Sequence, residues 1–138
     1  MKIDIRLMGK LTVFFTIFAF VAVLPFLPAS AAAENVVKVG NIIPLSGPSA
    51  SVGQQGKQAR EMAVAEINAA GGIKSLGGAK LQMIYADSES KPEKGVAEAE
   101  RLINTEKVNV LTGCWNSAVT YPTTAVSERY GIPFIVPV

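Results

Sequence analysis

The stretch that decides the fold is VVKVGNIIPL, at residues 36–45. It is rich in β-branched residues and apolar with few interruptions, which is the pattern of a strand covered on both faces. Turn-forming residues follow at 46–51, and residues 54–70 then carry apolar side chains at helical spacing and end at Gly71 and Gly72. A buried strand, a tight turn and a helix together predict the opening of an α/β unit.

The same alternation continues along the chain. Further strands are predicted at 81–87, 108–112 and 133–138, and further helices at 92–106 and 117–130. The second helix begins with Ser90-Lys91-Pro92-Glu93, which fits a capping box with proline in the first turn. Regular alternation with short connections predicts the α/β class, with a parallel doubly wound sheet, right-handed crossovers and helices on both faces.

Residues 1–33 have the pattern of a signal peptide. Three basic residues precede an apolar run at 11–26, and small residues follow that run up to Ala33. The run is shorter than the ~20 residues that a membrane-spanning helix needs, and no cysteine lies near its end to accept a lipid. We therefore expect cleavage after Ala33 and export of residues 34–138 to the periplasm.

The expected mature chain carries no net charge. The sequence has 13 basic and 11 acidic residues, and residues 1–33 hold three of the basic and one of the acidic ones. No basic surface is therefore expected for a nucleic-acid partner. Cys114 is the only cysteine, so the chain makes no internal disulfide and depends on a packed core. At full length we expect a monomer.

Several kinds of catalytic and cofactor site are excluded by composition. The sequence contains no histidine, so this chain can form neither a Ser-His-Asp triad nor the common histidine metal sites. It also has no G-x-x-x-x-G-K-[ST] run and no dinucleotide-binding glycine pattern after the first strand. We therefore expect a protein that is not an enzyme and that uses no cofactor and no metal.

Ligands of open parallel sheets bind outside the carboxyl ends of the strands. Among the loops expected there, GCWNS at 113–117 offers a glycine, an aromatic wall, an amide and a hydroxyl just before a helix. The free N–H groups and the dipole at a helix start favour a carboxylate. The alternative interpretation is that Ser117 only caps the helix and that Trp115 is a core residue.

Two other sets of residues have a structural and a functional interpretation. Asp87 and Glu89, in the loop after the second strand, could bind a cation, but two carboxylates in a turn are more often a solvated end. Cys114 has no basic neighbour that would lower the pKa of its thiol. We interpret it as a small buried side chain and not as a reactive thiol.

Three segments together resemble the periplasmic leucine/isoleucine/valine-binding protein family. Residues 37–48 are similar to its opening strand and loop, residues 53–74 to its first helix and following turn, and residues 131–133 to the entry into a later strand. The resemblance implies a bilobal type I periplasmic-binding-protein fold, with two α/β lobes joined by a hinge. Residues 34–138 would form the first half of lobe one, and the stop within the fourth apolar strand leads us to expect a fragment.

The resemblance also implies which residues bind the ligand. Ser117 matches the serine whose hydroxyl and backbone N–H receive the ligand's carboxylate, and Trp115 and Asn116 match neighbours that line the pocket. Val138 matches the start of the next ligand loop. Val52 lies where relatives place an aromatic residue over the ligand, a contact that the smaller side chain weakens.

By this resemblance the chain would be part of the substrate-binding component of an ABC importer. It would capture an amino acid, amide, urea or small carboxylate and deliver it to the membrane subunits of an ABC permease. Residues 113–118 look more like the amide- and urea-binding branch of the family than like the leucine-binding branch. Two alternatives stay open: a ligand-sensing extracellular lobe of a receptor or regulator, and a secreted α/β hydrolase with Ser117 as nucleophile, which lacks a histidine and the G-x-S-x-G turn.

Overall fold

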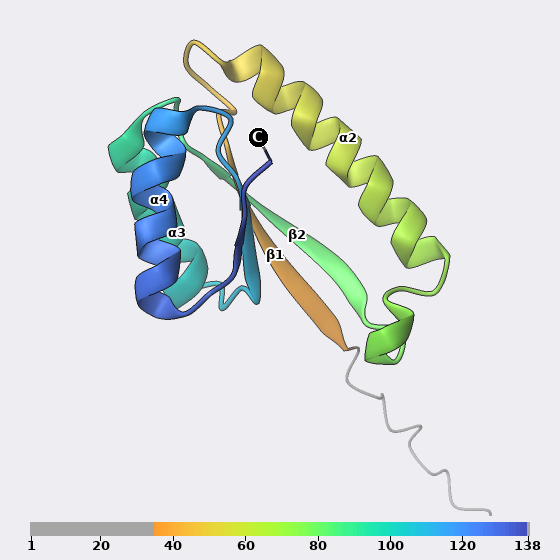
Figure 1. The fold of residues 1–138 in the computed structure, drawn as a ribbon. Helices are drawn as coiled ribbons and strands as arrows, with labels where there is room; N and C mark the ends of the chain where they lie inside the picture. Colours follow the sequence, from red (N-terminus) through yellow and green to blue (C-terminus); the bar gives the residue numbers. More distant parts are fainter. Residues whose placement is uncertain (1–34, 138) are drawn as a thin grey trace, which may run out of the picture. The chain divides into compact units, whose positions relative to one another are not determined.

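The computed structural model describes residues 35–137 (Figure 1). They form, in order, β1 Val36–Ile43, α2 Ala50–Ala69, the 3₁₀ turn η1 Lys74–Leu76, β2 Lys80–Asp87, α3 Pro92–Asn104, β3 Val110–Gly113, α4 Ser117–Tyr130 and β4 Phe134–Ile135. The predicted alternation of strands and helices is confirmed. The predicted signal peptide at residues 1–33 and the candidate ligand residue Val138 lie outside the described residues.

The four strands form one parallel sheet in the order β2-β1-β3-β4. β1 pairs with β2 along its whole length, from Val36 opposite Lys80 to Ile43 opposite Asp87. The predicted parallel α/β sheet is thus confirmed. Because all strands run in the same direction, the β1–α2, β2–α3 and β3–α4 loops leave the sheet at one edge, which we call the carboxyl edge.

One face of the sheet packs against α3 and α4 and holds the core (Figure 1). Ile42 of β1, Leu111 of β3 and Leu102 of α3 are completely buried there, and Val119 of α4 is 1% exposed. The two helices approach closely at Gly95, where a Cβ would lie 2.5 Å from Cγ1 of Val119. Burial of these apolar side chains is the main contribution to stability.

The other face of β1 and β2 is covered by α2 (Figure 1). The end of this helix is fixed to the edge strand by Asn68, whose side-chain amide exchanges two hydrogen bonds of 2.8 Å with the backbone of Leu81. The apolar side chains whose spacing predicts the helix are not buried: Met62 is 67% exposed and Ile67 is 40% exposed. Within residues 35–137, no helix is long and apolar enough to cross a membrane.

Some boundaries differ from the prediction. α2 begins at Ala50, four residues before the predicted start at 54, so the loop that follows β1 is shorter than expected. β3 is displaced toward the carboxyl edge and ends at Gly113. β4 comprises only Phe134–Ile135 of the apolar run predicted at 133–138.

The predicted capping box of α3 is wrong. Lys91 is the N-cap residue and makes no side-chain cap bond, although Pro92 is in the first turn as expected. Ser90 has a left-handed backbone, with φ 60°, instead of the extended conformation of an N-cap residue. Its hydroxyl accepts a hydrogen bond from the N–H of Ser49 in the β1–α2 loop, at 3.3 Å.

Candidate functional site

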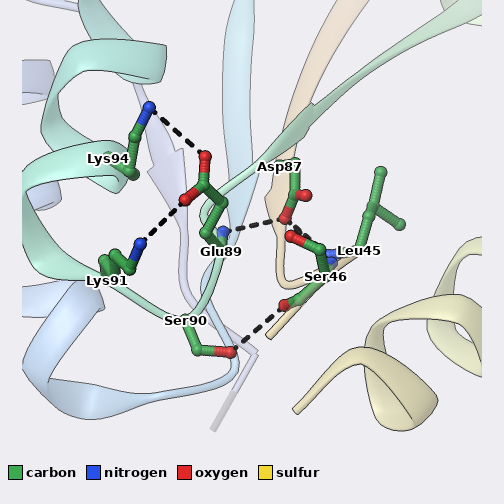
Figure 2. Close-up of polar contacts among 7 residues, drawn as sticks. All are labelled: Leu45, Ser46, Asp87, Glu89, Ser90, Lys91 and Lys94. Carbon is green, nitrogen blue, oxygen red and sulfur yellow. Dashed lines mark hydrogen bonds and ion pairs between the residues drawn. The ribbon is translucent and has the colours of Figure 1, made fainter. Parts of the chain in front are cut away.

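Two loops of the carboxyl edge are tied together by Asp87, the last residue of β2. Oδ1 of Asp87 accepts hydrogen bonds from the backbone N–H groups of Leu45 (2.8 Å), Ser46 (3.1 Å) and Glu89 (2.8 Å). Figure 2 shows these bonds together with the one that the Ser90 hydroxyl donates to the Ser46 carbonyl, at 3.5 Å. A single carboxylate oxygen thereby joins the β1–α2 loop to the β2–α3 loop.

The charge of Asp87 is stabilised by these donors. Burial raises the pKa of Asp87, but hydrogen bonds from the Ser46 side chain and from the backbone N–H groups outweigh burial and hold the pKa below its ordinary value. Its carboxylate is therefore ionised at neutral pH. Asp87 is partly exposed, but it is more than a solvated end, because one of its oxygens accepts hydrogen bonds from three backbone N–H groups.

Among the described residues, the side chain of Glu89 makes no hydrogen bond or ion pair with the β1–α2 loop. Its carboxylate pairs instead with Lys91 (3.0 Å) and Lys94 (3.2 Å) at the start of α3 (Figure 2). Hydrogen bonds from these two ammonium groups lower the pKa of Glu89. No group of three His, Cys, Asp or Glu residues that could hold a metal ion occurs within residues 35–137.

The β3–α4 loop begins with a close approach between backbones. Gly113 has φ 124°, and a Cβ on it would lie 2.0 Å from the carbonyl oxygen of Ile42, so only glycine fits there. The next residue, Cys114, donates its N–H to the same oxygen at 2.7 Å. Its side chain is 1% exposed, and burial raises the pKa of the thiol to about 11. The interpretation of Cys114 as a small buried side chain is confirmed.

At the start of α4, one residue caps the helix and the next one is the candidate ligand residue. Asn116 is the N-cap residue, and its Oδ1 accepts a hydrogen bond from the N–H of Ala118 at 2.9 Å. The interpretation of Ser117 as the cap is therefore wrong, since Ser117 is the first helical residue. Among residues 35–137, neither the hydroxyl nor the N–H of Ser117 has a hydrogen-bond partner. Trp115 is 65% exposed, so its interpretation as a core residue is also wrong.

A groove of about 460 Å³ lies between α2 and the carboxyl ends of β1 and β3. Val52 and Trp115, both predicted ligand residues, are among the side chains that line it. Asn116 and Ser117 follow Trp115 in the chain but do not belong to the lining. Most of the lining residues are apolar or small, and Gln55 and Arg60 of α2 supply the long polar side chains. A groove of this composition suits a small solute with an apolar body.

Sequence reasoning missed Asn41, a completely buried amide in the middle of β1. Its Nδ2 donates to the carbonyl of Thr112 at 3.3 Å, while its Oδ1 finds no donor among the described residues. Side chains alternate along a strand, so Asn41 shares the face of Ile43, which lines the groove. Buried acceptors without a partner are uncommon. The signal that could have revealed Asn41 was a lone amide inside an apolar strand.

Residues 36–138 match the family described as periplasmic binding protein. The chain belongs to this family. Among the curated relatives, the Leu/Ile/Val-binding protein homolog 7 of Brucella suis biovar 1 (strain 1330) is 34% identical over 113 residues. The match covers 82% of this chain and 27% of that relative.

Solved structures of periplasmic binding proteins have the same fold as the described residues. The substrate-binding protein LivJ of the branched-chain amino acid transporter of Streptococcus pneumoniae, in complex with isoleucine, matches with a TM-score of 0.69 and 29% identity, over 74% of this chain and 28% of that one. A solute-binding protein of an ABC transporter from R. palustris, in complex with benzoate, matches with a TM-score of 0.65 and 32% identity, over 74% and 27%. This chain therefore spans about a quarter of the length of the relatives that it matches.

The comparisons favour one of the classes of protein that the sequence left open. The resemblance to the leucine/isoleucine/valine-binding periplasmic proteins is confirmed, and so is the type I fold that it implies. The named relatives are substrate-binding proteins of transporters and not enzymes. A hydrolase with Ser117 as nucleophile has no support among them.

Proposed function

We propose that this chain is the N-terminal part of lobe one of an ABC importer's substrate-binding protein, which captures a small solute in the periplasm and delivers it to the permease. The names and ligands of the periplasmic binding proteins that it resembles support this role. In the proposed mechanism a second lobe closes over the ligand by hinge motion. No covalent step is required, in agreement with the absence of histidine from the sequence.

The observation that carries the proposal is the free polar end of α4 beside the groove. Ser117 presents an N–H and a hydroxyl without partners among the described residues, at the positive end of a helix of 14 residues. Both donors, together with the helix dipole, favour a carboxylate. Trp115, two residues before Ser117, and Val52 offer apolar surface in the groove.

The ligand class that fits this arrangement is a small carboxylate with an apolar body. Isoleucine and benzoate, the ligands named for two of the similar structures, share these two parts and little else. We propose that the carboxylate lies at Ser117 and the apolar body along Trp115. Because residues 113–118 resemble the amide- and urea-binding branch, urea and short amides are included among the compounds to be tested.

Ser117→Ala tests the proposal in the two-lobed protein that carries this chain. We expect the variant to bind ligand more weakly by about 1–2 kcal/mol, because one hydrogen bond to a charged group is lost while the backbone donor stays. Calorimetric titration with isoleucine, leucine, benzoate, 3,4-dihydroxybenzoate, urea and short amides gives the affinity of the parent and of the variant.

Asn116→Ala is the matched control. It removes the N-cap bond to Ala118, so we expect it to lower the free energy of unfolding by about 1 kcal/mol. Ser117→Ala leaves that bond intact and is expected to melt like the parent. Unchanged affinity in Ser117→Ala, for whichever compound the parent binds, would remove Ser117 from the site.

A further inference from the structure

We propose that Asp87 is a positioning residue for ligand binding, whose carboxylate holds the β1–α2 loop so that Pro44 and Val52 keep their places in the groove. Asp87 is not among the residues that line the groove. The inference rests on the proposed function, since it takes the groove as the place of the ligand's apolar body. It adds a residue that acts on affinity through a loop instead of through contact.

The first step is the attachment of the loop at both of its ends. The N–H groups of Leu45 and Ser46, directly after Pro44, converge on Oδ1 of Asp87. At the other end, the N–H of Ser49 donates to the Ser90 hydroxyl at 3.3 Å. The loop between β1 and α2 therefore takes its position from the β2–α3 loop (Figure 2).

The second step is the tightness of the contact between the two loops. A Cβ on Gly47, in the middle of the β1–α2 loop, would lie 2.6 Å from the carbonyl oxygen of Glu89. Glu89 and Ser90 both have left-handed backbones, with φ 50° and 60°. Non-glycine residues keep such conformations only where their surroundings determine them. The β2–α3 loop is thus held in one conformation, which suits a loop that positions another.

The third step leads from the loop to the groove. Gly53, in the first turn of α2, packs so closely on Pro44 that a Cβ would lie 1.8 Å from the Pro44 carbonyl oxygen. Pro44, Val52 and Gly53 all line the groove. Release of Leu45 and Ser46 would free Pro44 to move, and the start of α2 with it. The wall of the groove then occupies its binding position for only part of the time, and the apparent affinity falls in proportion.

The experiment compares Asp87→Ala with the parent in the two-lobed protein, using amide hydrogen exchange without ligand and calorimetric titration. The probes are isoleucine, benzoate and 3,4-dihydroxybenzoate. We expect exchange at residues 45–53 to become faster by on the order of tenfold, while the amides of β1 and β3 keep their protection. The affinity for the bound probe is expected to fall by on the order of tenfold. A general loss of stability would speed exchange throughout the sheet, so the local pattern separates positioning from a merely structural role.

Two further variants sharpen the comparison. Glu89→Gln removes the neighbouring carboxylate, which within residues 35–137 pairs only with Lys91 and Lys94. This variant is expected to leave loop exchange and affinity unchanged. Asp87→Asn keeps an acceptor oxygen but not its charge and is expected to show a smaller change of the same kind. If Asp87→Ala does not fold, Asp87→Asn decides the question.

Two results would overturn the positioning role while the proposed function stands. One is unchanged exchange at residues 45–53 in the Asp87 variants, and the other is faster exchange with unchanged affinity. If the parent binds neither these probes nor leucine, urea or short amides, the proposed function fails before any variant is made, and the positioning role fails with it.

Discussion

Close packing beside the groove makes Gly53→Ala a sharp test of the structure. A Cβ at Gly53 would lie 1.8 Å from the carbonyl oxygen of Pro44 and 2.6 Å from its carbon. Both are backbone atoms, which cannot rotate away as a side chain can. The first turn of α2 must therefore move away from the end of β1, by on the order of 1 Å. Overpacking costs about 1–3 kcal/mol, and the rigid backbone on each side places this case at the upper end. Alanine also gains ~1 kcal/mol over glycine in helix propensity. We therefore expect Gly53→Ala to lower the free energy of unfolding by about 2 kcal/mol.

Gly56→Ala, one turn later in the same helix, is the matched control. There a Cβ would meet only the guanidinium of Arg60, at 2.7 Å, and this flexible group can rotate away. We expect stabilisation by about 0.5–1 kcal/mol from helix propensity. Urea unfolding followed by far-ultraviolet circular dichroism gives both free energies. Equal changes in the two variants would refute the close contact between α2 and the end of β1.

Three further expectations concern single residues. Cys114 is buried, and burial raises the pKa of its thiol to about 11. We therefore expect it to resist Ellman's reagent at pH 8 in the folded protein and to react fully in guanidinium chloride. Rapid labelling of the folded protein would contradict its burial. Asp87 has a folded pKa below its unfolded value of about 4. Its stabilising contribution is therefore present above that value and lost as the pH falls through the folded pKa. In a plot of the unfolding midpoint against pH, we expect the midpoint of Asp87→Asn to fall less at acidic pH than that of the parent. Parallel curves for the two proteins would argue against this contribution. N-terminal sequencing of exported protein is expected to begin near Glu34, and a product that retains Met1 would contradict the signal peptide.

The order of elements was predictable because its signals are local. The apolar run at 36–45 and the helical spacing at 117–130 each depend on neighbours in the sequence, and both elements occur in the structure. The packing of α2 was not predictable in this way. The spacing of Met62 and Ile67 indicates a helix, but whether these side chains are covered depends on distant parts of the fold, and within the described residues they are exposed.

The place of the candidate site was predictable from the direction of the strands, but its bonding was not. The rule for parallel sheets leads directly to the carboxyl edge and to Trp115. Both Asn116 and Ser117 are good capping residues, so the sequence alone cannot say which one caps α4; the extended backbone of Asn116, with ψ 126°, decides it. The role of Asp87 in joining the two loops was not predicted, because two of its donors, Leu45 and Ser46, are more than 40 positions away in the sequence.

In the proposed site, stability and recognition are assigned to different residues at this edge. Asp87 and Asn116 make the hydrogen bonds that fix the loops, and neither lines the groove. Val52 and Trp115 line it with side chains that are 39% and 65% exposed. Substitution of an exposed side chain away from caps and buried networks changes stability by about 0.5 kcal/mol or less. The surface that would meet a ligand can therefore change without loss of the loop positions, which offers a physical reason why one scaffold serves ligands as different as isoleucine and benzoate in the similar proteins.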